Sequence, residues 1–317
     1  MAVLGVDIGG TKMALASFTN EGEIIKSSVV SLVKGDGRET GGMIKSIINS
    51  YLIASAKEGN RIESVGICVP GIYRQKKGTV WAPNIPGWDD YPLLQEVKTI
   101  TGTIPVNIDS DRACYILGEC WKGNARGCRD AIFMSIGTGI GAGIMIDGRV
   151  VRGSNDIAGA TGWMALDRPY RKEYLTCGCY EYNASGEGIA KVTREYLNSD
   201  SDYTGILRKK PVEKITSRDV FDAYDANDKI AVKVIEGSIE LWGMAVANFV
   251  SLFNPEKIIL GGGVFGPAVK LIPLIIKEAE RWAQPISITQ VSIEPSGLGT
   301  DAGVYGAAYL ALYTKPQ

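Results

Sequence analysis

Two short turns rich in glycine and threonine carry the residues best suited to binding phosphate. Each turn joins two apolar segments, and the turns follow residues 3–8 and residues 131–136. Their residues are Gly9, Gly10, Thr11 and Lys12 in the first turn and Gly137, Thr138 and Gly139 in the second. Glycine lets the backbone approach a ligand closely, and successive N–H groups in such turns form concave anion sites. The repeat favours two similar halves that face one ligand, so nucleotide-dependent phosphoryl transfer is the leading hypothesis.

The same turns fit a plainer interpretation, because glycine-containing turns join the strands of many β-hairpins. Neither turn matches the dinucleotide-binding fingerprint, in which a helix follows the glycines, and neither leads into the Gly-Lys-Ser/Thr of a P-loop. With two such turns in one chain, the phosphate-binding and hairpin interpretations are about equally supported.

Carboxylates at the ends of predicted strands are the candidates for acid–base and metal chemistry. Asp111 follows the strand predicted over residues 105–109, and its carboxylate could accept a proton from a hydroxyl nucleophile or simply cap the next helix. Asp109 lies at the neighbouring turn and is a second candidate base. Asp7 ends the first strand beside the phosphate turn, where it could hold hydrated magnesium or be a solvated strand-end carboxylate.

Composition excludes several classes of function. The chain has no histidine, so no mechanism can use an imidazole as base, nucleophile or metal ligand. Its 34 basic and 35 acidic residues nearly cancel, which argues against non-specific attraction to nucleic acid or an anionic membrane. No apolar run is long enough to span a bilayer, and the six irregularly spaced cysteines are expected to be reduced thiols. With a strand expected at the very start, the sequence predicts a cytoplasmic protein with no signal peptide and no DNA-reading module.

The hydrophobic pattern predicts strands that alternate with helices, so we expect an α/β fold with a mostly parallel sheet and an antiparallel meander at one edge. The predicted strands cover residues 3–8, 13–18, 24–33, 64–69, 105–109, 131–136, 142–146, 149–152, 257–260 and 286–295, and residues 79–85 are expected to contain a short extended piece. The predicted helices cover residues 41–56, 92–101, 112–122, 186–198, 217–226, 229–253, 269–282 and 301–313, and residues 158–183 are expected to be loop. Two domains follow, residues 1–118, joined by the last helix at 301–317, and residues 119–300.

Several motifs together resemble the ROK family of sugar kinases and repressors, within the sugar kinase/Hsp70/actin superfamily. The motifs are Asp7-Ile-Gly-Gly-Thr-Lys12, Val69-Pro-Gly71, Pro83-Asn-Ile-Pro-Gly-Trp88, Asp109-Ser-Asp-Arg-Ala113, Gly118-Glu119, Ile136-Gly-Thr-Gly-Ile-Gly-Ala-Gly143, Cys179-Tyr-Glu181, Ser185-Gly186 and Leu260-Gly-Gly-Gly-Val264. Together the motifs extend over nearly the whole chain, and their order and spacing are those of the family. The resemblance implies two similar domains of the actin-like ATPase (ribonuclease H-like) fold with a cleft between them. It also implies an ATP- and magnesium-dependent hexose kinase that forms a homodimer or a larger assembly such as a tetramer.

The resemblance also assigns expected roles to single residues. Asp111 corresponds to the catalytic base, and Asp7 to the residue that holds magnesium through water. The two glycine turns would bind the phosphates, and Gly261, Gly262 and Gly263 would admit the adenosine. The residues expected to contact the sugar are Gly71, Asn84, Ser110, Asp111, Trp163 and Glu181. Trp163 could equally be an ordinary core tryptophan, and the three glycines could form an ordinary strand-to-helix turn.

Two departures from the family pattern affect metal and sugar binding. Family kinases usually carry Gly-Glu-x-Gly-His before a cluster of zinc-binding cysteines, whereas this chain has Ala160 in place of the glutamate and Trp163 in place of the histidine. The cysteine cluster is shortened to Cys177-Gly-Cys179. Because structural zinc normally needs four nitrogen or sulfur ligands, we expect no zinc. We also expect glucose to be a poor substrate.

Three functions are therefore weighed. The first is an ATP-dependent sugar kinase with a small-molecule sugar as its partner. The second is a non-catalytic sugar-binding or regulatory ROK protein without a DNA-binding domain. The third is another superfamily ATPase with actin-like closure, which the sugar-binding motifs at Asn84 and Glu181 argue against.

Overall fold

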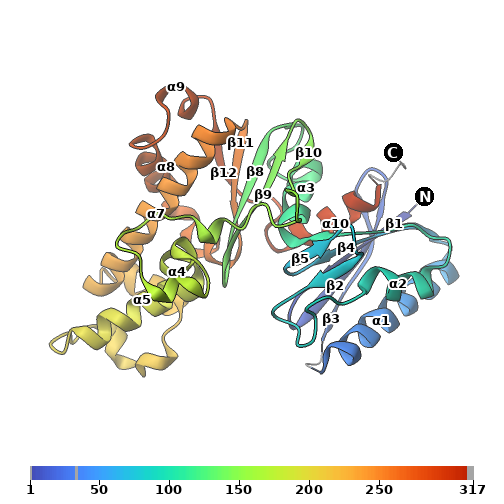
Figure 1. Cartoon of the computed structure of the whole chain (residues 1–317), viewed down its shortest axis with the longest axis horizontal. Coiled ribbons are helices and arrows are strands. Elements are labelled where there is room, and N and C mark those ends of the chain that lie inside the picture. Colours follow the sequence, from blue (N-terminus) through green and yellow to red (C-terminus); the bar gives the residue numbers. More distant parts are fainter. Residues whose placement is uncertain (1, 33–34, 313–317) are drawn as a thin grey trace. The chain divides into compact units, whose positions relative to one another are not determined.

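The computed structural model describes residues 2–32 and 35–312, in two compact units. The first unit comprises Met1–Gly127, Val150–Ala158 and Gly297–Gln317, and the second comprises Cys128–Arg149 and Gly159–Ser296. The ends of two predicted elements, at residues 33 and 313, lie outside the described residues. Figure 1 shows that each unit is built from a sheet with helices packed against it.

The first unit has a five-stranded sheet in the order β3-β2-β1-β4-β7. Its strands are β1 (Ala2–Ile8), β2 (Lys12–Thr19), β3 (Ile24–Ser31), β4 (Ile62–Val69) and β7 (Val106–Ser110), and a small hairpin is formed by β5 (Ile72–Arg74) and β6 (Thr79–Trp81). Strands β1, β2 and β3 form the predicted antiparallel meander, while β1, β4 and β7 are parallel. The helices are α1 (Gly37–Lys57), α2 (Leu93–Thr101), α3 (Asp111–Lys122) and α10 (Ala302–Leu312).

Helix α10 packs unusually close to the sheet and to α3, because small residues line its contacts. A Cβ atom on Gly66 of β4 would lie 1.8 Å from the Ala307 carbonyl oxygen, and one on Gly306 would lie 1.8 Å from the Cys114 carbonyl oxygen. No side chain fits at either position, so glycine is required there. The other face of the sheet carries the apolar side of α1, where Ile44 and Ile48 are fully buried.

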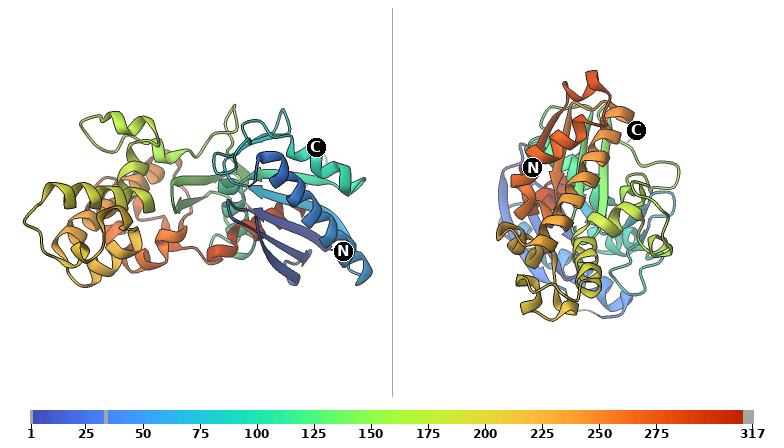
Figure 2. Two further views of the ribbon diagram at one scale, coloured as in Figure 1. Left: turned by 90° about the horizontal axis from the view of Figure 1, so that it is seen from below. Right: turned by 90° about the vertical axis from the view of Figure 1, so that its left-hand side faces the viewer.

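The second unit repeats the pattern with a sheet in the order β10-β9-β8-β11-β12. Its strands are β8 (Ala131–Ile136), β9 (Ile140–Ile146), β10 (Arg149–Val150), β11 (Lys257–Gly261) and β12 (Ser292–Pro295), and its helices are α4 (Cys179–Ala184), α5 (Gly186–Ser199), α6 (Ser217–Asp225), α7 (Lys229–Phe253), α8 (Ile272–Glu280) and α9 (Pro285–Ile288). Strands β8 and β9 are antiparallel, whereas β8, β11 and β12 are parallel. Two further views in Figure 2 show the long helix α7 and the helices around it. The core of this unit is built around the fully buried Trp242 of α7.

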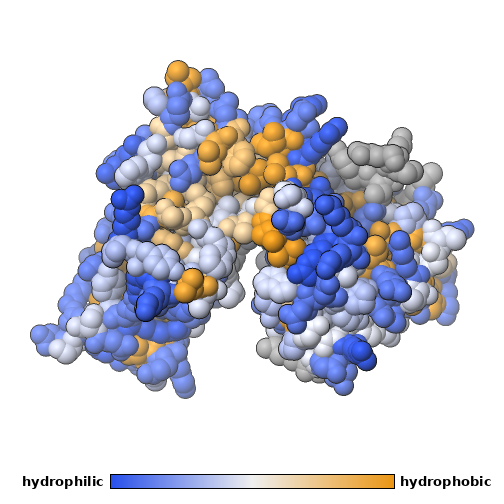
Figure 3. Space-filling model, in the orientation of Figure 1, coloured by the Kyte–Doolittle hydropathy of each residue, from blue (hydrophilic) through white to orange (hydrophobic). Residues whose placement is uncertain are grey.

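The surface is mixed in polarity. Figure 3 shows mostly hydrophilic residues on the face in view, with apolar residues gathered on the second unit around β8 and α8. Within residues 2–32 and 35–312, no helix is long and apolar enough to cross a membrane.

The predicted loop over residues 158–183 is wrong in part. It contains 3-10 turns at Thr161–Trp163 and Lys172–Leu175, and α4 begins inside it at Cys179. Helix α4 has only six residues, which is too short to show a helical period in the sequence. It is fixed instead by tertiary packing, since Tyr180 is fully buried.

Three other elements differ from their predicted bounds by more than two residues. Residues 286–295 form one helical turn, Pro285–Ile288, before the short strand β12, because the Gln284 side chain accepts hydrogen bonds from the N–H groups that begin the turn. The helix predicted over 269–282 starts as a 3-10 helix, Pro267–Leu271, and becomes α-helical only at Ile272. Helix α1 begins four residues earlier than predicted, at Gly37, because Asp36 forms a capping box with Glu39.

Candidate functional site

Three loops of the first unit meet at the carboxyl ends of its parallel strands. Asp7 pairs in register with Cys68 of β4, and Cys68 pairs with Asp109 of β7. Gly71 follows β4 after one residue, Pro70, and Asp111 follows β7 directly. The predicted base, the predicted magnesium residue and one predicted sugar-contacting residue are therefore brought to one edge of one sheet. This is the edge where open α/β sheets place their ligands.

Asp111 is the first residue of α3. The N-cap of this helix is Ser110, whose hydroxyl accepts a hydrogen bond from the Ala113 N–H at 3.4 Å. The Asp111 carboxylate accepts from the Arg112 N–H at 2.8 Å. Burial raises the pKa of Asp111 to about 6, and the Arg112 guanidinium partly opposes this rise. A carboxylate with such a pKa is largely ionised at neutral pH yet basic enough to accept a proton.

Asp109, the rival candidate base, is already paired. Its Oδ2 accepts from Nε and Nη2 of Arg152 at 2.8 and 2.5 Å, and its Oδ1 accepts from the Ser110 N–H at 2.8 Å. The Asp109 side chain is only 5% exposed. The Arg152–Asp109 pair therefore holds the backbone just before Asp111 in place.

The first phosphate turn is closed by a hydrogen bond from the Gly9 N–H to the Lys12 carbonyl at 2.9 Å, while Thr11 and Lys12 are exposed. Asp7 lies just before this turn, and burial raises its pKa. A Cβ atom on Gly303, at the start of α10, would lie 2.3 Å from the Asp7 carboxylate. Helix α10 thus leaves just enough room for the Asp7 side chain.

Two predicted sugar-contacting residues of the first unit, Gly71 and Asn84, lie in tight turns. Gly71 has a φ of 97°, and a Cβ atom there would clash with the Trp81 carbonyl oxygen at 2.3 Å. Asn84 is exposed in the turn between Ala82 and Trp88. This turn is anchored by the buried Trp88, whose Nε1 donates to the Gly37 carbonyl at 2.9 Å.

The second phosphate turn lies in the second unit and is held from two sides. The Gly137 N–H donates to the Gly139 carbonyl at 2.9 Å, and the Gly186 N–H donates to the Gly137 carbonyl at 2.8 Å. Oε2 of Glu181 accepts from the Ile140 N–H at 2.6 Å, and burial raises the pKa of this carboxyl group. Trp163 is 56% exposed, so it lies on the surface of the unit rather than in its core.

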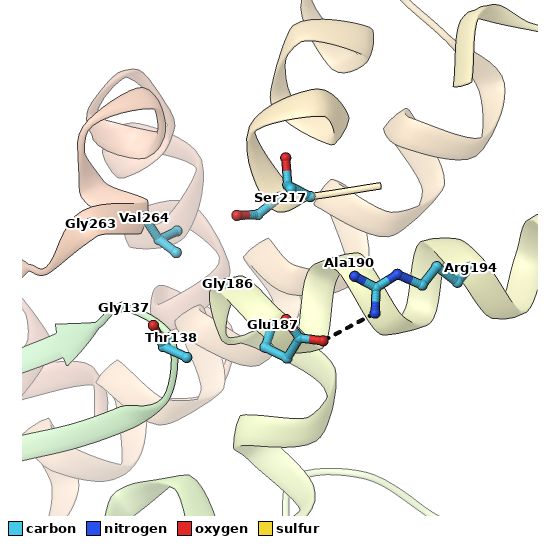
Figure 4. A pocket seen from close by; sticks show the side chains of 10 residues that line it. Gly137, Thr138, Gly186, Glu187, Ala190, Arg194, Ser217, Gly263 and Val264 are labelled. Atoms are coloured by element: carbon cyan, nitrogen blue, oxygen red, sulfur yellow. Dashed lines mark hydrogen bonds and ion pairs between the residues drawn. The ribbon is translucent and has the colours of Figure 1, made fainter. Parts of the chain in front are cut away.

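A pocket of about 270 Å³ opens beside this second turn (Figure 4). Gly137 and Thr138 form one wall, and Gly263 and Val264 form another. The remaining lining residues come from helices α5 and α6 and the residue before α6: Gly186, Glu187, Ala190, Arg194, Thr216 and Ser217. Arg194 donates to the Glu187 carboxylate at 3.1 Å across the pocket lining.

Sequence reasoning anticipated part of this pocket. The glycines at 137, 139 and 261–263 were expected near nucleotide, and Gly263 does line the pocket. Gly261 instead packs against the Phe133 ring, and Gly262 has a φ of 92° that turns the chain. Arg194 and Ser217 were not anticipated, because nothing in the sequence distinguishes them from other polar residues of amphipathic helices.

Comparison with known proteins identifies the family. The profile of the ROK family matches residues 3–314. The chain belongs to the ROK family. A glucokinase from Halalkalibacterium halodurans is 33% identical over 97% of this chain and 94% of its own. A ROK glucokinase from Streptomyces griseus, solved with glucose and AMPPNP, is 29% identical, with a TM-score of 0.78 over 99% of this chain and all of its own.

A ROK transcriptional regulator, a homolog of the E. coli MLC protein, gives a TM-score of 0.86 at 25% identity over 98% of this chain and 78% of its own. The two-unit α/β architecture is thus the actin-like ATPase fold of ROK proteins. This confirms the fold expected from the sequence.

The ROK segment that usually supplies glutamate, histidine and zinc-binding cysteines has a different chemistry in this chain. Ala160 precedes the 3-10 turn Thr161–Trp163 and Trp163 is its last residue, while Cys177 and Cys179 are free thiols. Among the described residues, no group of three or more histidine, cysteine, aspartate or glutamate side chains is arranged to hold a metal ion. The absence of bound zinc remains a prediction, since it requires analysis of the purified protein.

Proposed function

We propose that this ROK protein is an ATP-dependent sugar kinase that transfers the γ-phosphoryl group to a hydroxyl of a hexose or hexose derivative. The observation that carries the proposal is the placement of Asp111, with a pKa raised by burial to about 6, at the same sheet edge as Asp7 and the first phosphate turn. Phosphoryl transfer needs positioning, charge stabilisation and one carboxylate that accepts the proton of the nucleophile. Family membership and the kinase relatives support the same reaction.

In this proposal, the second unit binds the nucleoside part of ATP. At this pocket Gly137 and Gly263 would let phosphate approach the backbone, the Thr138 hydroxyl would donate to it, and Glu187 and Ser217 would offer hydrogen-bonding groups to the ribose hydroxyls. A small, partly apolar pocket with a few polar groups is typical of such ligand sites. The first unit would contact the terminal phosphates through residues 9–12, with the Lys12 ammonium as a further source of positive charge.

Magnesium would bind with the nucleotide rather than in a cage of protein ligands. Asp7 is the one carboxylate directly before the first phosphate turn, and a single carboxylate plus phosphates and waters is a normal set of ligands for this ion. When bound, magnesium would neutralise charge on the transferring phosphoryl group. The Asp7 side chain would orient one of its waters.

Asp111 would accept the proton of the sugar hydroxyl as that hydroxyl attacks the γ-phosphorus. The Ser110 cap and the Arg152–Asp109 pair fix the backbone on which Asp111 sits. The other proposed sugar contacts are Gly71, Asn84, Ser110, Trp163 and Glu181. Because Ala160 and Trp163 remove a carboxylate and an imidazole, glucose should make fewer polar contacts than in a typical family kinase.

The same two residues favour one alternative, a ROK protein that binds sugar for a regulatory purpose without turnover. Release of ADP across a panel of neutral and anionic hexoses, amino-hexoses and N-acetyl derivatives separates the two functions. The kinase proposal expects sugar-dependent ADP release with some hexose other than glucose. Sugar binding without ADP release from any member of the panel would favour the regulatory function. A cytoplasmic location and a homodimeric or tetrameric assembly stay predictions.

A further inference from the structure

Arg112 is the one partly buried arginine among the described residues that has no carboxylate oxygen within 4.0 Å. The others are Arg74, Arg152, Arg171 and Arg194, and each pairs with an aspartate or glutamate. The guanidinium of Arg112 makes a single long hydrogen bond, from Nη2 to the Gly71 carbonyl at 3.4 Å. Since a guanidinium has five N–H donors, most of the hydrogen-bonding capacity of Arg112 is unused.

The position of the Arg112 guanidinium follows from the elements around it. Arg112 is the second residue of α3, directly after Asp111, and its side chain reaches back to the turn after β4. Both Asp111 and Gly71 belong to the proposed sugar-binding part of the first unit. The Arg112 charge acts on this region, because it lowers the pKa of Asp111 against the effect of burial. The guanidinium therefore lies where a sugar substrate would be held.

A partly buried cation without a carboxylate in salt-bridge contact is costly, and natural proteins normally satisfy such a group by pairing it. Arginine is suited to carboxylate and phosphate, because its planar fork binds two oxygens of either group. We propose that Arg112 binds an anionic group of the substrate, so that the phosphoryl acceptor is a hexose carrying a carboxylate or a phosphate. This inference rests on the proposed kinase function and names the substrate class of the same site.

The departures at Ala160 and Trp163 are consistent with this chemistry. The carboxylate that family kinases place at the position of Ala160 would repel an anionic sugar, and this chain lacks it. Specificity depends on repulsive groups that reject a ligand as well as on attractive ones, so the loss of this carboxylate removes a group that would reject an anionic sugar.

The test measures equilibrium binding with matched sugars: glucose, glucuronate and glucose 6-phosphate, and the corresponding galactose series. Titration calorimetry with the full-length wild-type protein should show at least about tenfold tighter binding of one anionic sugar than of its neutral parent. In Arg112→Gln, binding of that sugar should weaken about 10–100-fold, which is the value of a hydrogen bond to a charged group. Binding of the neutral parent should change less than about threefold. Whichever of the two anionic sugars binds more tightly, the uronate or the sugar phosphate, identifies the anionic group that Arg112 recognises.

Two controls make the outcome decisive. Arg112→Lys keeps the charge but loses the fork, so it should retain part of the preference for the anionic sugar. Arg129→Gln removes an equal charge from the exposed Arg129–Asp147 pair of the second unit and should leave the preference unchanged. Equal affinity for neutral and anionic sugars in the wild type, or an equal loss for both in Arg112→Gln, would overturn the inference.

The failure of this inference can be distinguished from failure of the kinase proposal. Sugar-dependent ADP release with neutral hexoses alone would keep the kinase and refute the role of Arg112. Arg112-dependent binding of an anionic sugar without any ADP release would keep the anion site and refute the kinase.

Discussion

At the scale of single residues, Asp111 should determine how activity depends on pH. Its carboxyl pKa is raised to about 6, mainly by burial, so the residue should be protonated and inactive as a base in mildly acidic solution. We expect kcat/KM to rise with pH through about 6 and then level off. The measurement is a pH–rate profile with the best sugar substrate. A profile that stays flat from pH 5 to pH 8 would contradict the assignment.

The same pKa has a consequence for stability. The pKa of Asp111 in the folded protein is about 6, above the value of 3.8 for an exposed aspartate. The stabilising effect of the neutral carboxyl group is therefore fully present below pH 3.8 and is lost as pH rises through about 6. Asp111→Asn removes the buried charge, so it should be at least as stable as the wild type at pH 8. Its advantage should shrink at pH 5. Thermal unfolding at the two pH values checks this, and a variant that is much less stable at pH 8 would indicate that Asp111 is mainly structural.

Arg152 is expected to act as a positioning residue through Asp109. Arg152→Met leaves a buried carboxylate without its partner, so the free energy of unfolding should fall by about 3 kcal/mol and turnover should fall as well. The double variant Asp109→Asn/Arg152→Gln leaves no unpaired charge and should recover much of the lost stability. Urea unfolding of the two variants is the measurement. A double variant no more stable than Arg152→Met would show that the pair is not what stabilises this turn.

At the scale of secondary-structure elements, the sequence predicts those elements that depend on local residue patterns. The glycine turns, the meander and the long helix α7 follow from alternation, helical period and turn residues. Helix α4 could not be foreseen, because it is short and fixed by the burial of Tyr180. The pocket in Figure 4 was only partly foreseen, since Arg194 and Ser217 come from helices whose approach to the Gly137 turn is a tertiary property.

Helix α10 offers a matched test of how packing overrides helix propensity. Gly306→Ala should destabilise the protein by about 1–3 kcal/mol or more, because the added Cβ would meet the Cys114 carbonyl oxygen at 1.8 Å. Gly42→Ala on α1 adds the same methyl group where nothing lies within 4 Å, so it should raise stability by about 0.5–1 kcal/mol. Thermal unfolding of both variants is the measurement. Equal effects would mean that α10 does not pack this closely on α3.

At the scale of the whole molecule, the chain is expected to fold without a structural metal. The shortened Cys177-Gly-Cys179 segment and the lack of histidine leave too few ligands for a zinc site. Elemental analysis of purified protein should find well under one zinc per chain, and chelation should not lower its melting temperature. About one zinc per chain, with unfolding after chelation, would refute this expectation.

The whole molecule is expected to transfer phosphate from ATP to a sugar with Asp111 as the base. The most direct test follows ADP release and the mass of the phosphorylated sugar together, for the wild type and for Asp111→Asn, with Asp222→Asn as an exposed control. The account predicts a phosphorylated sugar in amounts equal to ADP, a rate about 10²–10⁴-fold lower in Asp111→Asn, and unchanged turnover in Asp222→Asn. Turnover in Asp111→Asn at the wild-type rate, or ADP release without a phosphorylated sugar, would contradict it.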